Sequence, residues 1–172
     1  VLVGTQMLSK GHHFPDVTLV IVVEADLGLN IPDYRAAERT FQLLVQVAGR
    51  AGRGDSAGKV FIQTRNPEHY CWNYILQNDY LGFFEQEVLA RQRFRYPPFT
   101  NLALVRMSYP SEWEPGPDLV RELGDAMRHK ARELGIRVLG PAPSPLGRLK
   151  QRTRWQCMLK GDDWAGIRQV FQ

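Results

Sequence analysis

Two arginines and a glutamine in the stretch QVAGRAGRG, residues 46–54, are the side chains of this sequence best suited to bind an anion. At about 100° per residue, a helix through this stretch gathers its polar side chains within about 60° of one another. That face holds Arg39, Gln42, Gln46, Gly49, Arg50 and Arg53. The opposite, apolar face holds Phe41, Leu44, Val45 and Ala48. Because the planar guanidinium group is always charged and binds two oxygens at once, the polar face predicts phosphate binding.

Two glycines in the same stretch, Gly49 and Gly52, support this interpretation. Each costs about 1 kcal/mol relative to alanine inside a helix, and a face that meets only water gains nothing in return. Glycine suits a backbone that a ligand approaches closely, or a helix that must end so that Arg53 can turn toward a ligand. An ordinary solvated helix face is the alternative.

A second polar stretch, GTQMLSKGHHFP at residues 4–15, follows the apolar residues VLV. If VLVGT is a strand of a parallel sheet, this loop lies at the carboxyl edge of the sheet, where ligands usually bind. Adjacent His12 and His13 have no cysteine or carboxylate at ligand spacing, so no metal site is predicted. Asp26 ends the next apolar run, TLVIVVEAD, and its carboxylate is expected at the same edge. We favour a turn or helix-capping role for it over a catalytic one.

These stretches need an α/β scaffold, and the first third of the chain alternates strand and helix signals. Strands are predicted at VLVGT, VTLVIVVEAD and GKVFIQT, with a long helix from about Tyr34 to Ala51. Uninterrupted β-branched runs are typical of parallel strands that are covered on both faces. Two aromatic-rich helices follow between Pro67 and Arg95, and YPPF at residues 96–99 indicates a domain boundary. The predicted parts are a domain at 1–69, a helical linker at 70–98 and a domain at 99–172.

Beyond YPPF the predicted elements are strand, helix, strand, strand and helix. The strands are TNLALVRMSY, IRVLGPAP and RTRWQCMLKG, and a proline-rich turn separates the last two. The helix has the spacing of a buried stripe, formed by Leu119, Val120, Leu123, Ala126, Met127, Ala131 and Leu134. This order indicates a small α+β domain of the split βαβ, ferredoxin-like type.

The last predicted strand is strongly basic, since residues 148–160 contain cations and no acid. A strand's period of two places Arg152, Arg154 and Gln156 on one face. The other face holds Trp155, Cys157 and Leu159. The basic face suits DNA phosphates, with salt-sensitive binding, or an acidic peptide tail with a free carboxylate. A solvated edge strand protected by its charge is the alternative. We favour a core position for Trp155 over stacking on bases.

Composition and charge set broad limits on the class of protein. The chain has 172 residues, 44% of them hydrophobic, and a formal net charge of +4 that lies entirely in the second half. It has no apolar run of membrane-spanning length and no leader, so a cytoplasmic location without membrane partners is expected. Cys71 and Cys157 lack CxxC spacing and are expected to be buried thiols. The start at Val1, inside an apparent strand, predicts a fragment of a longer protein.

Several of these stretches match a known family. QVAGRAGR resembles motif VI of superfamily 2 helicases, the Q-x-x-G-R-x-x-R of their second RecA-like lobe. The longer stretches VGTQMLSKGHHFPDVTLV and DLGLNIPDYRAAERTFQLLVQVAGRAGR, with YPPF and RWQ, are similar to the PriA family of replication-restart helicases, also called primosomal protein N′. The resemblance covers nearly the whole chain, and it is dense in the first part and thin beyond Pro98.

The resemblance implies that the first domain is part of the second lobe of an ATP-dependent 3′-to-5′ DNA helicase. It also implies a role for each candidate site residue of this domain. Arg50 and Arg53 would be arginine fingers that reach the γ-phosphate of ATP, bound with Mg²⁺ on a first lobe, and Gln46 would position the nucleotide or the attacking water. The nucleotide-binding residues would be Gly11, His13 and Gly49. The residues that touch the phosphates of the tracked strand would be Thr5, Gln6 and Lys10.

The resemblance also implies partners for the C-terminal half. Lys150 and Arg154 would bind branched or single-stranded DNA, and Arg152 and Gln156 the acidic tail of single-stranded DNA-binding protein. Other primosome proteins are further expected partners, and Zn²⁺ belongs to the longer protein because its cysteine ligands are absent from this sequence. The alternative function is a non-enzymatic DNA- or protein-binding module. A less favoured one is a superfamily 2 enzyme that acts on RNA.

Overall fold

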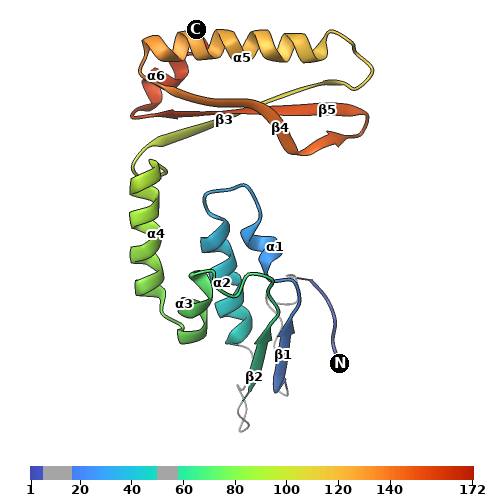
Figure 1. Ribbon diagram of the computed structural model, residues 1–172, viewed down its shortest axis with the longest axis vertical. Coiled ribbons are helices and arrows are strands. Elements are labelled where there is room, and N and C mark those ends of the chain that lie inside the picture. The colour runs from blue at the N-terminus through green and yellow to red at the C-terminus, as the bar shows by residue number, and fades with distance from the viewer. Residues whose placement is uncertain (6–16, 50–57) are drawn as a thin grey trace. The chain divides into compact units, whose positions relative to one another are not determined.

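The computed structural model describes residues 1–5, 17–49 and 58–172, which form two compact units, 1–89 and 90–172 (Figure 1). The strands are β1 (Leu19–Val22), β2 (Lys59–Ile62), β3 (Asn101–Pro110), β4 (Arg137–Leu149) and β5 (Arg152–Gly161). The helices are α1 (Asp26–Leu29), α2 (Ala36–Ala48), α3 (Cys71–Gln77), α4 (Tyr80–Phe94), α5 (Gly116–Glu133) and α6 (Trp164–Gln169). None of the helices in the described ranges is long and apolar enough to cross a membrane.

The first unit is built on a parallel pair of strands, as predicted. β1 pairs with β2 in register from Leu19 with Lys59 to Val22 with Ile62. The connection between them runs through α1 and α2, so α2 begins beside the carboxyl edge of β1 and ends toward the amino edge (Figure 1). Helices pack on one face of the pair and enclose a core that consists of Ala25, Phe41, Leu44, Cys71, Trp72, Ile75 and Phe83.

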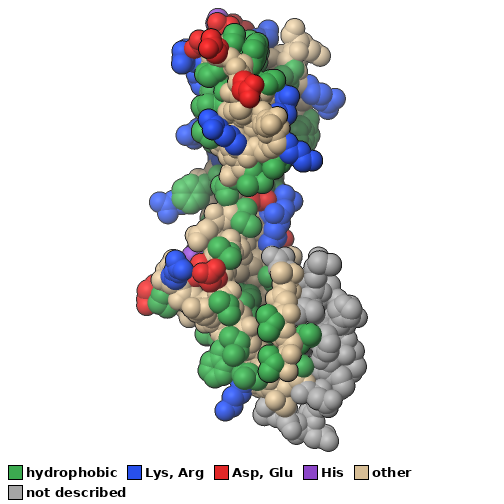
Figure 2. All heavy atoms as spheres, turned by 90° about the vertical axis from the view of Figure 1, so that its right-hand side faces the viewer, with side chains coloured by type: hydrophobic (Ala, Val, Ile, Leu, Met, Phe, Trp, Pro, Cys, Tyr) green, Lys and Arg blue, Asp and Glu red, His purple; other side chains and the backbone are tan. Residues whose placement is uncertain are grey.

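The sequence predicts that these strands are covered on both faces. For the described residues this prediction is wrong. Leu19, Ile21 and Phe61 are exposed, and they alternate with partly buried residues along the two strands. Figure 2 shows apolar side chains gathered over this part of the surface. The reason is that α2 and α3 cover one face only, and no described element of the unit packs on the other.

The strand predicted at VLVGT is also absent. Residues 1–5 are exposed and belong to no strand, because a strand needs a neighbour for its backbone hydrogen bonds and the described residues provide none.

Helix α2 separates a core face from a polar face as its sequence predicts. Its buried residues are Ala36, Thr40, Phe41 and Leu44, and Arg39, Gln42 and Gln46 are exposed. The helix is shorter than the predicted span, since it begins at Ala36 and ends at Ala48 with Gly49 as its cap. The end of α2 therefore lies directly before the arginines of the motif.

Both helices of the predicted linker are present. Asn78, with φ of 52°, ends α3 in the left-handed conformation. The Asp79 carboxylate then accepts a hydrogen bond from the Gly82 backbone at 2.9 Å, which fixes the start of α4. Buried Glu87 of α4 accepts a hydrogen bond from the hydroxyl of Tyr70, so the polar group inside this segment is satisfied.

The second unit is an antiparallel sheet with the strand order β3-β5-β4. β3 and β4 both run antiparallel to β5, so they are parallel to each other and are joined through α5, which is the split βαβ arrangement. The element order agrees with the prediction. Helices α5 and α6 lie on one face of the sheet (Figure 1). The core between these layers consists of Met127, Ala131, Ile136, Cys157, Leu159, Ile167 and Val170.

The buried stripe of α5 is narrower than predicted. Val120, Met127 and Ala131 are buried, but Leu119 and Leu123 are 40% and 44% exposed. Ala126 is exposed as well. The reason is a close approach at Gly124, where a Cβ atom would lie 2.5 Å from Cδ of Pro141. This contact turns the face centred on Gly124 toward the sheet and leaves the flank with Leu119 and Leu123 outside.

The proline-rich stretch predicted as a turn is part of β4. Prolines are tolerated there because β4 is an edge strand, and its register with β5 shifts between Leu139 and Ala142 and again between Pro143 and Arg148. The chain reverses instead at Lys150 and Gln151, whose φ values are 51° and 58°. Two consecutive residues with positive φ are typical of a two-residue hairpin turn.

Candidate functional site

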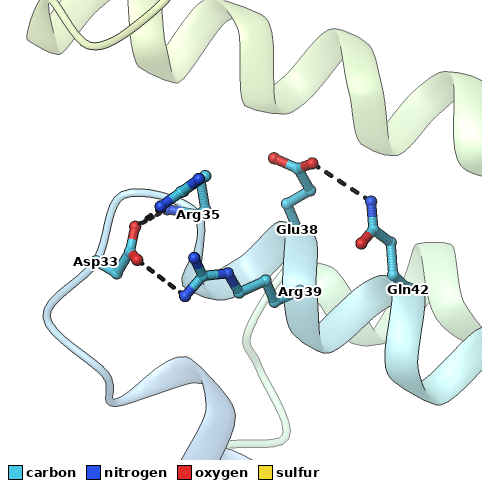
Figure 3. A network of polar contacts seen from close by, with 5 residues as sticks. All are labelled: Asp33, Arg35, Glu38, Arg39 and Gln42. Atoms are coloured by element: carbon cyan, nitrogen blue, oxygen red, sulfur yellow. Dashed lines mark hydrogen bonds and ion pairs between the residues drawn. The ribbon is translucent and has the colours of Figure 1, made fainter.

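The polar face of α2 begins with a network centred on Asp33 (Figure 3). The Asp33 carboxylate accepts hydrogen bonds from the backbone N–H of Arg35 at 3.0 Å and pairs with Nη1 of Arg39 at 2.9 Å. Burial alone raises the pKa of Asp33, but the hydrogen bonds and charges of Arg35 and Arg39 outweigh it and lower the pKa. The Arg39 side chain is therefore engaged in an ion pair with Asp33, although it shares a helix face with Gln46.

The other end of this face carries Gln46 and Gly49. Gln46 is exposed, and Gly49 has φ of −66° and ψ of 0°. A Cβ atom at Gly49 would meet the Val45 carbonyl at 3.4 Å, an ordinary contact, so neither the backbone conformation nor packing among the described residues requires glycine. The helix does end at Gly49, but the two reasons given for the glycines, a close ligand and a turn of Arg53 toward it, stay predictions.

Several predicted site residues lie outside the described ranges, so their predictions stand as such. They are Gln6, Lys10, Gly11, His13, Arg50 and Arg53. Gly52, which supported the motif, also lies outside. Thr5 is described, and it is exposed in a stretch without regular structure.

Asp26 lies at the carboxyl edge of the sheet in a structural role. Its two carboxylate oxygens accept hydrogen bonds from Oγ1 of Thr64 at 2.6 Å and from the backbone N–H of Arg65 at 2.7 Å. The hydrogen bond from Thr64, followed by that from Arg65, lowers the pKa of Asp26. Asp26 thus joins the start of α1 to the loop after β2. These contacts fit the structural role favoured from the sequence better than a catalytic role.

The topology separates Asp26 from the described end of α2. Asp26 follows the carboxyl end of β1, whereas α2 runs back along the strands and ends toward their amino edge. Lys59 starts β2 at that amino edge, where its backbone N–H donates to the Thr18 carbonyl at 2.8 Å. A ligand bound at the end of α2 would therefore lie at the opposite edge of the sheet from Asp26.

The basic strand alternates as predicted. Cys157 and Leu159 are fully buried, and Arg152, Arg154 and Gln156 belong to the opposite face of β5, which we call the outer face. Arg152 is exposed, and Arg154 and Gln156 are partly exposed. Burial raises the pKa of the Cys157 thiol. This outer face extends beyond β5, because the neighbouring strand β3 contributes side chains directly opposite those of β5.

One such residue, Arg106 of β3, was missed by the sequence reasoning. The register places Arg106 directly opposite Gln156 and Ser108 opposite Arg154. Arg106 is exposed, as is Ser108. The period of two in NLALVRMSYP contains the signal for a polar face, but only the strand pairing shows that this face continues the one on β5.

Two cations of the basic strand are already engaged within the unit. Nη2 of Arg152 donates to the Ser108 carbonyl at 2.7 Å, and its Nε donates to the Ser108 hydroxyl at 3.2 Å. Nζ of Lys160 donates to the Phe94 carbonyl at 3.2 Å. Burial, and then the charge of Arg137, lower the pKa of Lys160. Lys150 lies in the hairpin turn and is exposed.

Trp155 lies on the inner side of the sheet, the side favoured from the sequence, but it is partly exposed and does not belong to the buried core. It pairs across the sheet with Met107, and its Nε1 donates to the hydroxyl of Tyr109 at 3.4 Å. Its indole is therefore occupied by contacts within the domain. Among the described residues, no group of three or more His, Cys, Asp or Glu side chains is placed to hold a metal ion.

Comparison with known proteins shows similarity along most of the chain. Residues 92–171 match the family described as the primosomal protein N C-terminal domain. The chain is 43% identical over 160 residues to the replication restart protein PriA of Bacillus subtilis, covering 93% of this chain and 20% of that protein. It is 44% identical to the Synechocystis protein of the same name, with 92% and 19% covered. The chain spans about a fifth of the length of these relatives.

Proposed function

We propose, since this chain belongs to the family of PriA replication restart proteins, that it is the C-terminal part of an ATP-dependent 3′-to-5′ DNA helicase that acts in replication restart. The proposal places the first unit in the second RecA-like lobe and assigns DNA and partner binding to the second unit. A bacterial cytoplasmic location near the nucleoid follows from this role. The observation that carries the enzymatic part is α2, an amphipathic helix with an exposed Gln46 that ends directly before Arg50.

The proposed ATP site is formed only in part by this chain, because the nucleotide would be bound mainly on the first lobe. Gln46, Arg50 and Arg53 fit a triphosphate because they offer hydrogen-bond donors and fixed positive charge but no competing carboxylate. Positive charge at the γ-phosphate stabilises the transition state of phosphoryl transfer. The described residues contain no cluster of acidic side chains that would hold Mg²⁺, so we assign the metal to another part of the polypeptide. Gly11, His13 and Gly49 would border the nucleotide, and Zn²⁺ is likewise assigned to the longer protein.

The test uses the complete protein and measures DNA-stimulated ATP hydrolysis. Arg50→Ala and Arg53→Ala are each expected to lower kcat by about a thousandfold or more, because an arginine finger contributes that much to phosphoryl transfer. Arg39→Ala is the matched control, since Arg39 lies on the same helix face but is paired with Asp33. If both variants keep near-normal ATP turnover, Arg50 and Arg53 are not arginine fingers and the enzymatic proposal fails.

The second unit is proposed to bind DNA and protein partners. Lys150 and Arg154 are assigned to phosphates of branched or single-stranded DNA, together with Thr5, Gln6 and Lys10 of the first unit. Arg152 and Gln156 are assigned to the acidic tail of single-stranded DNA-binding protein, and other primosome proteins are further partners. The basic outer face supports both assignments. Arg152→Glu is expected to abolish capture of an acidic peptide, and unchanged affinity would overturn the peptide assignment.

The second candidate function is a binding module without enzymatic activity. The basic outer face favours it, because this surface does not depend on a nucleotide site. If the chain binds DNA, and the complete protein turns over ATP normally with both motif arginines replaced, this alternative is correct. No observation favours an RNA substrate over DNA.

A further inference from the structure

The outer face of the C-terminal sheet is uniform in its charge. None of the strands β3, β4 and β5 contains an aspartate or glutamate. Acidic residues of this unit lie on α5, in the loop before it and around the start of α6. Figure 2 shows Lys and Arg side chains spread over the C-terminal unit, and Asp and Glu side chains toward its upper end, where Figure 1 has α5. The strands of this unit thus carry cations without acids, whereas α5 carries both signs of charge.

Arg106 and Arg154 are the available cations at the centre of this face. Arg106 is opposite Gln156, and Arg154 is opposite Ser108, so the two arginines are diagonal neighbours on adjacent strands, about 7–8 Å apart at the backbone. Within the described residues, neither guanidinium group takes part in a hydrogen bond or ion pair. Arg152 follows on β5, and its guanidinium group is held across the strand by Ser108. These arginines form a continuous run from β3 toward the hairpin turn.

Strands β3 and β5 contribute no aromatic side chain to this face. From β3 it presents Leu102, Leu104, Arg106 and Ser108, and from β5 Arg152, Arg154, Gln156, Met158 and Lys160. Binding of unpaired bases relies on aromatic side chains as stacking surfaces. The nearest tryptophan, Trp155, belongs to the inner side and donates its N–H to Tyr109. A nucleic acid at the centre of this face, around Arg106 and Arg154, therefore meets guanidinium groups rather than rings.

We propose that Arg106 of β3 binds DNA phosphate beside Arg154 of β5, so that this central part of the outer face contacts DNA through the phosphate backbone alone. The inference rests on the DNA binding proposed above and adds a residue and a mode of contact to it. Cations distributed over two strands fit a polymer with regularly spaced charge better than a short acidic peptide, whose carboxylates need a local cluster. Because no base is contacted, we expect binding of both duplex and single-stranded DNA, with no preference for one base over another.

The test uses the 172-residue chain and fluorescence anisotropy with labelled duplex, oligo-dT and oligo-dA at several salt concentrations. Arg106→Gln is expected to reduce the slope of log K against log salt by about 1, because one phosphate contact is lost. Arg106→Lys should restore the slope. Arg132→Gln, which removes the same charge from an exposed position on α5, should leave it unchanged. Circular dichroism confirms that each variant is folded.

Different results overturn different parts of the proposal. If the unchanged chain binds DNA and Arg106→Gln keeps the full salt slope, the inference fails and the proposed DNA binding stands. If Arg132→Gln lowers the slope equally, only net charge matters and Arg106 has no special role. A preference between oligo-dT and oligo-dA overturns backbone-only contact. If the chain binds oligo-glutamate but none of the DNA probes, the DNA-binding proposal fails as well, and the face belongs to acidic peptides.

Discussion

The ammonium group of Lys160 lies 3.5 Å from the centroid of the Tyr96 ring while it donates a hydrogen bond to the carbonyl of Phe94. Phe94 is the last residue of α4, where helix carbonyls lack partners and carry partial negative charge. An ion pair between Arg95 and Asp162 and a hydrogen bond from Thr100 to the Gly161 carbonyl act at the same place. The turn after α4 is therefore fastened to the end of β5.

Replacing Lys160 should loosen this turn. Lys160→Met keeps the apolar stem but removes the charge, so it loses the cation–π contact and the hydrogen bond to Phe94. We expect a loss of about 1 kcal/mol in the free energy of unfolding, measured by urea titration. Cleavage by chymotrypsin after Tyr96 or Phe99 should become faster. Lys130→Met on exposed α5 is the control, and equal effects of the two changes would contradict a fastening role.

Asp33 should stabilise the start of α2. Asp33→Ala removes the carboxylate that accepts from the Arg35 backbone and pairs with Arg39. The free energy of unfolding should fall by about 1 kcal/mol, as expected for loss of a charge-assisted hydrogen bond and an ion pair at the start of a helix. Asp125→Ala removes an exposed ion pair within α5 and should cost about 0.5 kcal/mol or less. Helix content measured by circular dichroism at partial denaturation would reveal fraying of α2, and no difference between the two variants would exclude a stabilising role of Asp33 at its start.

Asp26 should contribute to stability in a pH-dependent way. Hydrogen bonds from Thr64 and Arg65 lower its pKa in the folded state below the ordinary value of 3.8. The unfolded chain therefore binds more protons in that range, so this contribution is complete above the ordinary pKa and is lost as pH falls through the lowered folded value.

Asp26→Asn cannot titrate, so its stability should fall less steeply on the acid side. The measurement is the urea midpoint as a function of pH for the two proteins. Thr64→Val, which removes the strongest partner, should give an intermediate steepness. An acid limb that is equally steep in all three proteins would show that Asp26 is not the titrating group.

The two cysteines should be unreactive in the folded protein. Burial, followed by the negative charge of Glu87, raises the pKa of Cys71 to about 12. Burial also raises the pKa of Cys157. Since the thiolate is the reactive form, almost no reaction with a disulfide reagent is expected at neutral pH until urea unfolds the chain. Rapid modification of either thiol without loss of structure would show that its site opens without unfolding.

Patterns within single elements were predictable because each depends on local geometry. The helical period divided α2 into a core face with Phe41 and Leu44 and a polar face with Gln46. The strand period divided β5 into a buried face with Cys157 and Leu159 and a basic face with Arg154. The order of elements also predicted the split βαβ arrangement, since few topologies connect short elements in that order. The sequence by itself thus determined which side chains share a face.

Only the tertiary structure decided how those faces meet. The contact between Gly124 and Pro141 turned α5 so that Leu123 stayed outside, although its spacing is that of a buried residue. Strand pairing placed Arg106 beside Gln156, residues too far apart in the chain for any periodicity to connect. The position of β4 at the sheet edge allowed its prolines to remain in a strand. Each outcome depends on packing and register between distant segments, which a local period cannot specify.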